Sequence, residues 1–180
     1  MKKKTLTETP KILEAKQLLD DLEAIAKDSV ELFQVVPLIP EPLPAERLGI
    51  EPQDKQKDTY VLRWHTNDIQ AVKSRELAIR YDTWYQKASA LVERYVPYQS
   101  RAFNEVAKIM ESYVTMNRYA VATKEMLESA NKEHDRGYVS VYLVEFASII
   151  SSQANIVRSI ISIPERIPLP QPRCFITGSQ

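Results

Sequence analysis

The sequence predicts an all-α fold, a bundle of about four long helices. Several long stretches place apolar residues at alternating spacings of three and four, which is the repeat of one helix face. Prolines cluster between and after these stretches, and proline interrupts a helix because it lacks an amide donor. Apolar faces of this length must be buried, so we expect the helices to pack antiparallel, as in a bundle or coiled coil.

The stretch 79–96 belongs to the central helix of this prediction. Its apolar and aromatic side chains recur every three or four residues, at Leu77, Tyr81, Trp84, Ala88, Leu91 and Tyr95. Charged residues between them fall on other faces and can stay in water. The helix should end at Val96, because the residue before Pro97 is pushed out of the helical region.

The chain before the central helix divides into a tail, a helix and a loop. After a tail over 1–9, Thr9 and Pro10 suit a helix start, and a helix is predicted over 10–33. The proline-rich stretch 36–58 predicts an extended loop on apolar surface, with a proline-motif ligand for another domain as the alternative. The stretch 60–64 fits a strand or helical turns, and helix is predicted because no second strand candidate is evident.

Two more helices follow the central one. The third should begin near Ser100 and extend toward Leu127, with a kink or break over 115–119, where the periodicity weakens. A polar turn over 131–137 leads to the last helix, predicted over 138–163. Its polar residues argue against a membrane span and for a core helix. The helical domain therefore covers 10–163, and an extended C-terminal tail covers 164–180.

Composition excludes several chemistries. The 180 residues suit one domain, and the 24 basic residues equal the 24 acidic ones, so no global field favours nucleic acid. No secretory pattern follows the basic start, and Cys174 is alone, so we expect a cytoplasmic protein with a reduced thiol. The scarcity of glycine, only three residues, excludes glycine-rich phosphate loops.

No catalytic, cofactor-binding or metal-ligating residues are predicted. His65 and His134 are the two histidines, and neither has a second histidine or a glutamate at ligand spacing. A serine nucleophile on a Gly-x-Ser-x-Gly turn is also absent from the sequence. A non-enzymatic protein is therefore favoured.

The candidate interaction or pocket residues mix aromatic and basic side chains around the central helix. They are Arg80, Tyr81, Trp84, Tyr85, Arg94, Arg101 and Tyr113. Such a mixture can stack and clamp single-stranded nucleic acid, but it also suits a packed helical core with amphipathic edges. Nearby Asp82 and Glu93, with the zero net charge, favour the core interpretation.

The run Tyr81-Asp82-Thr83-Trp84-Tyr85-Gln86-Lys87-Ala88, with Val96-Pro97 and Phe103 after it, resembles a helical region of uncharacterised prokaryotic proteins that precedes a HEPN-type helical domain. Many HEPN proteins are ribonucleases of toxin–antitoxin and phage-defence systems, whose active form combines an arginine, a short spacer and a histidine. Here Arg63 is too close to His65, and Arg118 is too far from His134. The resemblance thus implies a helical accessory region or a non-catalytic relative.

Three functions follow. The first is a non-enzymatic interaction or accessory protein of prokaryotic type, linked to defence by the resemblance, that binds a protein partner or itself. The second is an RNA-linked HEPN-like protein, a degraded ribonuclease or RNA binder, with a basic face of Arg80, Arg94, Arg101 and Lys108. The third is a small-molecule pocket between helices, lined by Tyr81, Trp84 and Tyr113. No membrane partner and no cofactor are expected.

Overall fold

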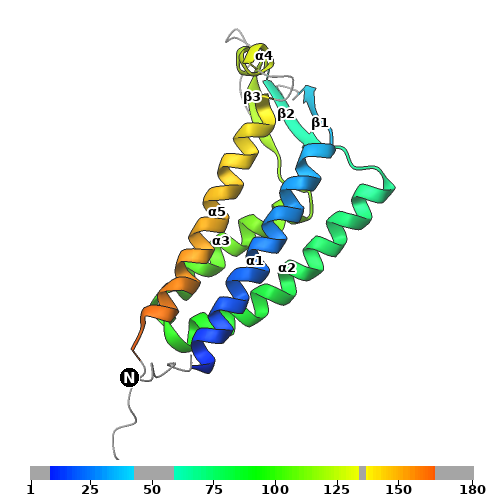
Figure 1. Cartoon of the computed structure of the whole chain (residues 1–180). Helices are drawn as coiled ribbons and strands as arrows, with labels where there is room; N and C mark the ends of the chain where they lie inside the picture. The colour runs from blue at the N-terminus through cyan, green and yellow to red at the C-terminus, as the bar shows by residue number, and fades with distance from the viewer. Residues whose placement is uncertain (1–8, 43–58, 134–136, 165–180) are drawn as a thin grey trace, which may run out of the picture.

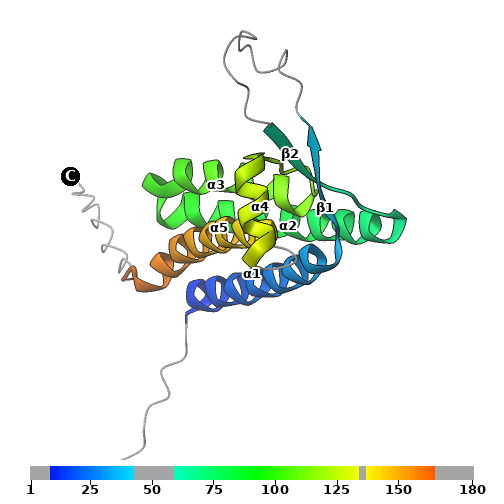
Figure 2. The same ribbon diagram turned by 90° about the horizontal axis from the view of Figure 1, so that it is seen from above.

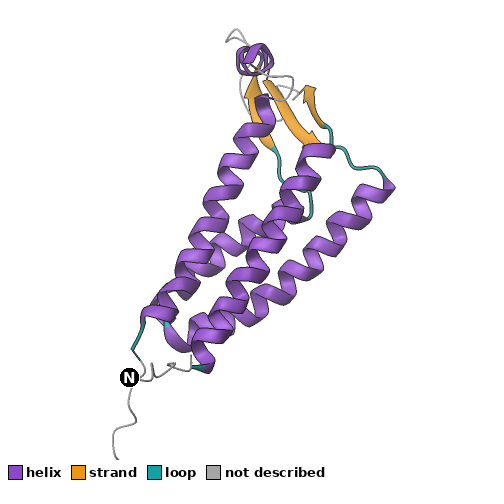
Figure 3. Cartoon of the chain, in the orientation of Figure 1, coloured by secondary structure: helices purple, strands orange, loops and turns teal. Residues whose placement is uncertain are grey.

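The computed structural model describes residues 9–42, 59–133 and 137–164, and these form a mainly helical fold with one small sheet (Figures 1 and 3). The helices are α1 (Pro10–Val35), α2 (Asp68–Tyr95), α3 (Ser100–Val114), α4 (Lys124–Glu133) and α5 (Gly137–Ser162), with a short 3₁₀ turn, η2 (Pro97–Gln99), before α3. The strands are β1 (Leu38–Pro42), β2 (Thr59–Trp64) and β3 (Ala120–Thr123). The prediction of a predominantly helical protein is confirmed, and the prediction that it is all-α is wrong.

Helices α1, α2, α3 and α5 run alongside one another and alternate in direction (Figure 1). Helices α1 and α3 run toward the end that carries the sheet, while α2 and α5 run away from it. Helix α1 contacts both α2 and α5, and α3 contacts the same two helices from the other side. The view from above shows α1 lying alongside α5 (Figure 2). The core therefore lies along the space that these four helices enclose.

The ends of the long helices agree with the local sequence. Pro10 occupies the first turn of α1, as predicted. Asn67 begins α2 with a capping box, in which its Oδ1 accepts from the amide of Gln70 at 2.9 Å and Gln70 Oε1 accepts from the amide of Asn67 at 3.0 Å. Gln70 Nε2 also donates to the carbonyl oxygen of Val35 at 3.1 Å. This side chain thus joins the start of α2 to the end of α1.

The sheet is antiparallel with the order β1-β2-β3, and it corrects two predictions. Residues 60–64, predicted as helix, lie in β2, and part of the proline-rich loop forms β1. Alternate residues turn inward: Leu38, Leu62, Trp64 and Ala122 join the core. Ile39, Arg63 and Val121 lie on the exposed face. The rest of the predicted loop, over 43–58, lies outside the described residues.

The prolines of β1 explain why this strand was missed. Pro40 and Pro42 are two residues apart, so their nitrogens point to the same side of the strand. At the edge of a sheet that side needs no hydrogen bond, and proline is tolerated there. The third strand is only four residues long, which is too short for a clear alternation signal. Without a clear partner strand in the sequence, the pattern of residues 60–64 does not by itself indicate a strand.

The third helix is shorter than predicted. It ends at Val114, and Met116 then adopts a positive φ of 58°, a left-handed conformation in which the helix cannot continue. The break expected over 115–119 is present, but the chain beyond it forms β3 and a separate helix, α4, that includes Leu127. Of the turn predicted over 131–137, residues 131–133 belong to α4 and 134–136, with His134, lie outside the described residues.

An aromatic cluster joins the sheet to the helices. Phe33 stacks on Trp64 with ring centroids 5.3 Å apart and meets Phe146 edge-on at 5.1 Å. Tyr142 packs against Trp64 and donates to the carbonyl oxygen of Leu62 at 3.1 Å. These contacts bring α1, β2 and α5 into one core, so the sheet is part of the same packing unit as the helices. None of the described helices is long and apolar enough to cross a membrane.

Candidate functional site

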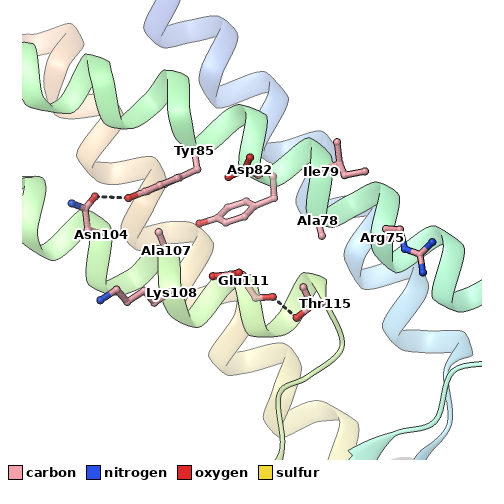
Figure 4. A pocket seen from close by; sticks show the side chains of 11 residues that line it. Arg75, Ala78, Ile79, Asp82, Tyr85, Asn104, Ala107, Lys108, Glu111 and Thr115 are labelled. Atoms are coloured by element: carbon pink, nitrogen blue, oxygen red, sulfur yellow. Dashed lines mark hydrogen bonds between the residues drawn. The ribbon is translucent and has the colours of Figure 1, made fainter.

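Two spaces between helices are candidates for a functional site. The first is a cavity of about 410 Å³ between α2 and α3, which contains two of the residues predicted from the sequence, Tyr81 and Tyr85 (Figure 4). From α2 it is also lined by Arg75, Ala78, Ile79 and Asp82, and from α3 by Asn104, Ala107, Lys108, Glu111 and Thr115. The second is a groove between α1 and α5.

Tyr81 is the most buried of the residues with a polar side chain that line the first cavity. Only 4% of Tyr81 is exposed, and its oxygen accepts a hydrogen bond from Nε2 of Gln153 on α5 at 2.6 Å. Burial raises the pKa of this hydroxyl well above the usual tyrosine value, and the bond from Gln153 opposes that rise. Oε1 of Gln153 is buried and has no partner among the described residues. The Tyr81–Gln153 pair is therefore only half satisfied.

Tyr85 closes one end of the cavity. Its hydroxyl donates to Oδ1 of Asn104 at 2.9 Å, across from α2 to α3 (Figure 4). Its ring stacks on Phe103 at a centroid distance of 5.9 Å, which fixes the ring plane. Because Oδ1 of Asn104 accepts this bond, the amide nitrogen of Asn104 keeps its donors for another group.

Four charged side chains surround the opening. Arg75 and Asp82 come from α2, and Lys108 and Glu111 come from α3 (Figure 4). Arg75, Lys108 and Glu111 make no ion pair within the described part of the chain, and Asp82 accepts only a long 3.4 Å bond from Gln86 there. Both signs of charge are thus available to a molecule in the cavity.

The other predicted aromatic residues are structural. Trp84 is buried, stacks on Tyr81 at 5.6 Å and donates its indole N–H to the carbonyl oxygen of Leu18 at 2.7 Å. Tyr113 is fully buried and donates its hydroxyl to Glu145, which also accepts from Arg118. Neither residue lines the α2–α3 cavity with Tyr81.

The predicted arginines are held by separate neighbours. Arg80 pairs with Asp28 of α1, and Arg101 pairs with Glu105, one turn further along α3. Arg94 lies over the ring of Tyr95 at 5.3 Å. Lys108, the fourth member of the expected basic face, lines the α2–α3 cavity instead. Two of these four charges are already neutralised by a carboxylate.

The groove between α1 and α5 was not foreseen as a site. It has a volume of about 600 Å³, and its apolar lining comes from Ala26, Val30, Leu143, Phe146, Ala147 and Ile150. Glu23, Lys27 and Glu31 follow one another at four-residue intervals along its α1 side. None of these three makes an ion pair with a residue that the structure describes.

Other members of both sites were also missed. In the sequence, nothing distinguishes Asn104, Lys108 and Glu111 from other polar residues on a helix. They line a cavity only because α2 lies opposite them. Gln153 could have been singled out, because it is a polar residue at a position where the repeat of the last helix otherwise places apolar ones. Among the described residues, no group of histidine, cysteine or carboxylate side chains is arranged to hold a metal ion.

Comparison with known proteins returned no relative. No protein-family model, no curated protein and no solved structure matches the chain. The two sites must therefore be interpreted from their own geometry.

Proposed function

We propose that this chain is a four-helix bundle that acts as a non-enzymatic interaction protein and self-associates through its α1–α5 face. The observation that carries the proposal is the apolar groove between α1 and α5. Grooves of this kind accept the apolar face of another helix. The occupant proposed here is a second copy of the chain.

The outer face of α5 supports an interface. Its exposed residues from 144 to 155 are Val144, Ala147, Ser148, Ser151 and Asn155, and none of them carries a charge. Charged residues make up 27% of the chain, so a solvent-facing helix would normally include several. Depletion of charge together with small and apolar residues is typical of a surface that another helix covers.

The size of this face also suits a dimer. Helices α1 and α5 contain 26 residues each, and at 1.5 Å per residue each is about 39 Å long. Two such helices packed about 10 Å apart offer a face of roughly 800 Å². A stable interface needs about 800 Å² from each partner, so the α1–α5 face is large enough by itself.

The charges on α1 support a two-fold arrangement. Glu23, Lys27 and Glu31 alternate in sign at four-residue intervals. In a two-fold dimer, residue i of one copy meets residue j of the other, and j meets i. If the α1 helices lie antiparallel and centred near residue 25, Lys27 of each copy meets Glu23 of the other. A centre near residue 29 pairs Lys27 with Glu31 instead.

The RNA-linked function remains a prediction. A phosphate backbone would be bound by unpaired lysines and arginines on one face. Arg80 and Arg101 already pair with carboxylates, so the contacts of these residues add no support to an RNA-binding face.

The experiment is light scattering coupled to size exclusion, at low and high salt. The wild-type protein should have twice the chain mass of 20.7 kDa. Lys27→Glu makes positions 23, 27 and 31 all acidic. The double variant Glu23→Lys/Glu31→Lys makes the same three positions all basic. Each variant should be a monomer alone, and an equimolar mixture of the two should restore the dimer.

Ile69→Glu is the matched control, because Ile69 is 70% exposed but lies at the start of α2, away from this face. That variant should stay dimeric. A wild-type protein that is monomeric at both salt concentrations would overturn the proposal. A Lys27→Glu variant that dimerises as well as the wild type would exclude α1 from the interface.

A further inference from the structure

We infer that the cavity between α2 and α3 binds a small zwitterion with an apolar body, which is the chemistry of an aromatic amino acid. This inference is independent of self-association, because the cavity shares no residue with the α1–α5 groove. It depends on three features of the described residues: space, a polar wall and opposite charges at the opening.

Each of the two helices contributes one alanine to the lining of the cavity. Ala78 of α2 and Ala107 of α3 both line the cavity, and their methyl side chains leave a gap that larger residues would fill (Figure 4). The resulting volume of about 410 Å³ falls within the range of roughly 300–1,000 Å³ that small-molecule sites occupy. An apolar ring can therefore lie over the alanines.

The inner wall supplies a hydrogen-bond donor. Because the Tyr81 oxygen accepts from Gln153, its own proton is left for another acceptor, and no described residue takes it. A buried, half-satisfied polar pair is costly unless a bound molecule completes it. A ligand oxygen against Tyr81 would complete the bond. The Asn104 amide, whose Oδ1 is engaged by Tyr85, offers a second donor.

The opening carries both signs of charge on both helices. Arg75 lies toward the Thr115 end of the cavity, and Lys108 lies toward the Asn104 end, with Asp82 and Glu111 between them (Figure 4). A purely anionic ligand would meet Asp82 and Glu111, and a purely cationic one would meet Arg75 and Lys108. A ligand with one ammonium and one carboxylate can pair with both sets, which selects a zwitterion.

The test uses phenylalanine as the probe, with three analogues that each lack one feature. These are 2-phenylethylamine without the carboxylate, 3-phenylpropionate without the amine, and glycine without the ring. Titration calorimetry and thermal unfolding should show that phenylalanine binds and raises Tm, because a ligand that binds only the folded state stabilises it. Each analogue should bind at least about tenfold more weakly, since each loses a charged or apolar contact.

Variants of residues that line the cavity test whether phenylalanine binds there. Ala107→Leu should fill the gap and abolish binding. Lys108→Gln and Glu111→Gln change only exposed side chains and should each weaken binding by about tenfold. Arg101→Gln is the control, because Arg101 is exposed on the same helix but lies outside the cavity. This variant should bind phenylalanine as tightly as the wild type.

Absence of phenylalanine binding by wild type, or equal binding of 2-phenylethylamine, would overturn the inference. Unchanged binding in Lys108→Gln and Glu111→Gln would do the same, even if Ala107→Leu failed to fold. The monomeric Lys27→Glu variant should bind phenylalanine like wild type. The two proposals can therefore fail separately.

Discussion

Tyr81 and Tyr113 are two buried tyrosines that both hydrogen-bond to α5, yet their hydroxyl groups differ in how fully they are satisfied. Tyr113 donates to Glu145, a partly exposed carboxylate that also accepts from Arg118. Tyr81 meets a fully buried neutral amide, Gln153, whose second polar atom has no partner among the described residues. The first hydroxyl belongs to a completed network and the second does not.

This difference indicates which of the two tyrosines is expected to lie at a functional site. A buried phenol whose partner reaches solvent costs little, because water and a second side chain satisfy the rest of the network. A buried phenol against a half-paired amide is a local defect that packing alone would not retain. Tyr81 lines the α2–α3 cavity, and Tyr113 does not line that cavity. Each of the following predictions measures one side of this comparison.

The largest effect is expected from Tyr81→Phe. The variant removes the hydroxyl and leaves both polar atoms of the Gln153 amide buried without a partner, so the free energy of unfolding should fall by about 1–3 kcal/mol. Urea unfolding measures it. The double variant Tyr81→Phe/Gln153→Met replaces both partners by apolar groups of similar shape and should recover most of that loss. A double variant as unstable as the single one would show that the amide is not the source of the cost.

The second-largest effect is expected at alkaline pH, where the free energy of unfolding should fall as the pH rises. Burial raises the pKa of Tyr81 in the folded state above the unfolded value of about 10, so above that pH the unfolded chain releases a proton that the folded chain keeps. The stability is fully present below pH 10 and is lost as pH rises, by about 1.4 kcal/mol per pH unit for each such tyrosine. The pKa of Tyr113 is raised in the same direction, by burial and then by its bond to Glu145.

Urea unfolding between about pH 9 and pH 11 measures this slope. Tyr81→Phe and Tyr113→Phe should each make it shallower by the contribution of one tyrosine. Tyr98→Phe is the control, because Tyr98 is 77% exposed and should leave the slope unchanged. A slope identical in all three variants would contradict the assignment to buried phenols.

The smallest effect is expected from Tyr113→Phe at neutral pH. Glu145 keeps Arg118 and solvent as partners, so only one hydrogen bond is lost, and the free energy of unfolding should fall by about 0.5–1.5 kcal/mol. The same urea experiment measures it beside Tyr81→Phe. A larger loss for Tyr113→Phe than for Tyr81→Phe would reverse the comparison.

The helices were largely predictable from the sequence because their signals are local. Apolar repeats and Pro10 at the start of α1 placed α1 and α5 close to their observed bounds, and Pro97 placed the end of α2. The sheet was not predictable in this way. Its strands are short, one carries two prolines, and their partners lie far apart in the chain.

The candidate sites were predictable only in part. Tyr81 and Tyr85 were singled out from the sequence and do meet at the α2–α3 cavity. Trp84 and Tyr113 belong to the core, and nothing in the sequence separates them from Tyr81, because all lie on apolar helix faces. The sequence shows which face of a helix is apolar, but not whether a neighbouring helix fills that face.

By itself, the sequence determined that this protein is mainly helical and where most of its long helices run. Those properties depend on residues close together in the chain, so local pattern is sufficient. The tertiary structure decided the sheet, the pairing of Tyr81 with Gln153, the cavity between α2 and α3, and the apolar groove between α1 and α5. Each of these depends on the distance between helices or strands that are remote in sequence, and packing of the whole chain sets that distance.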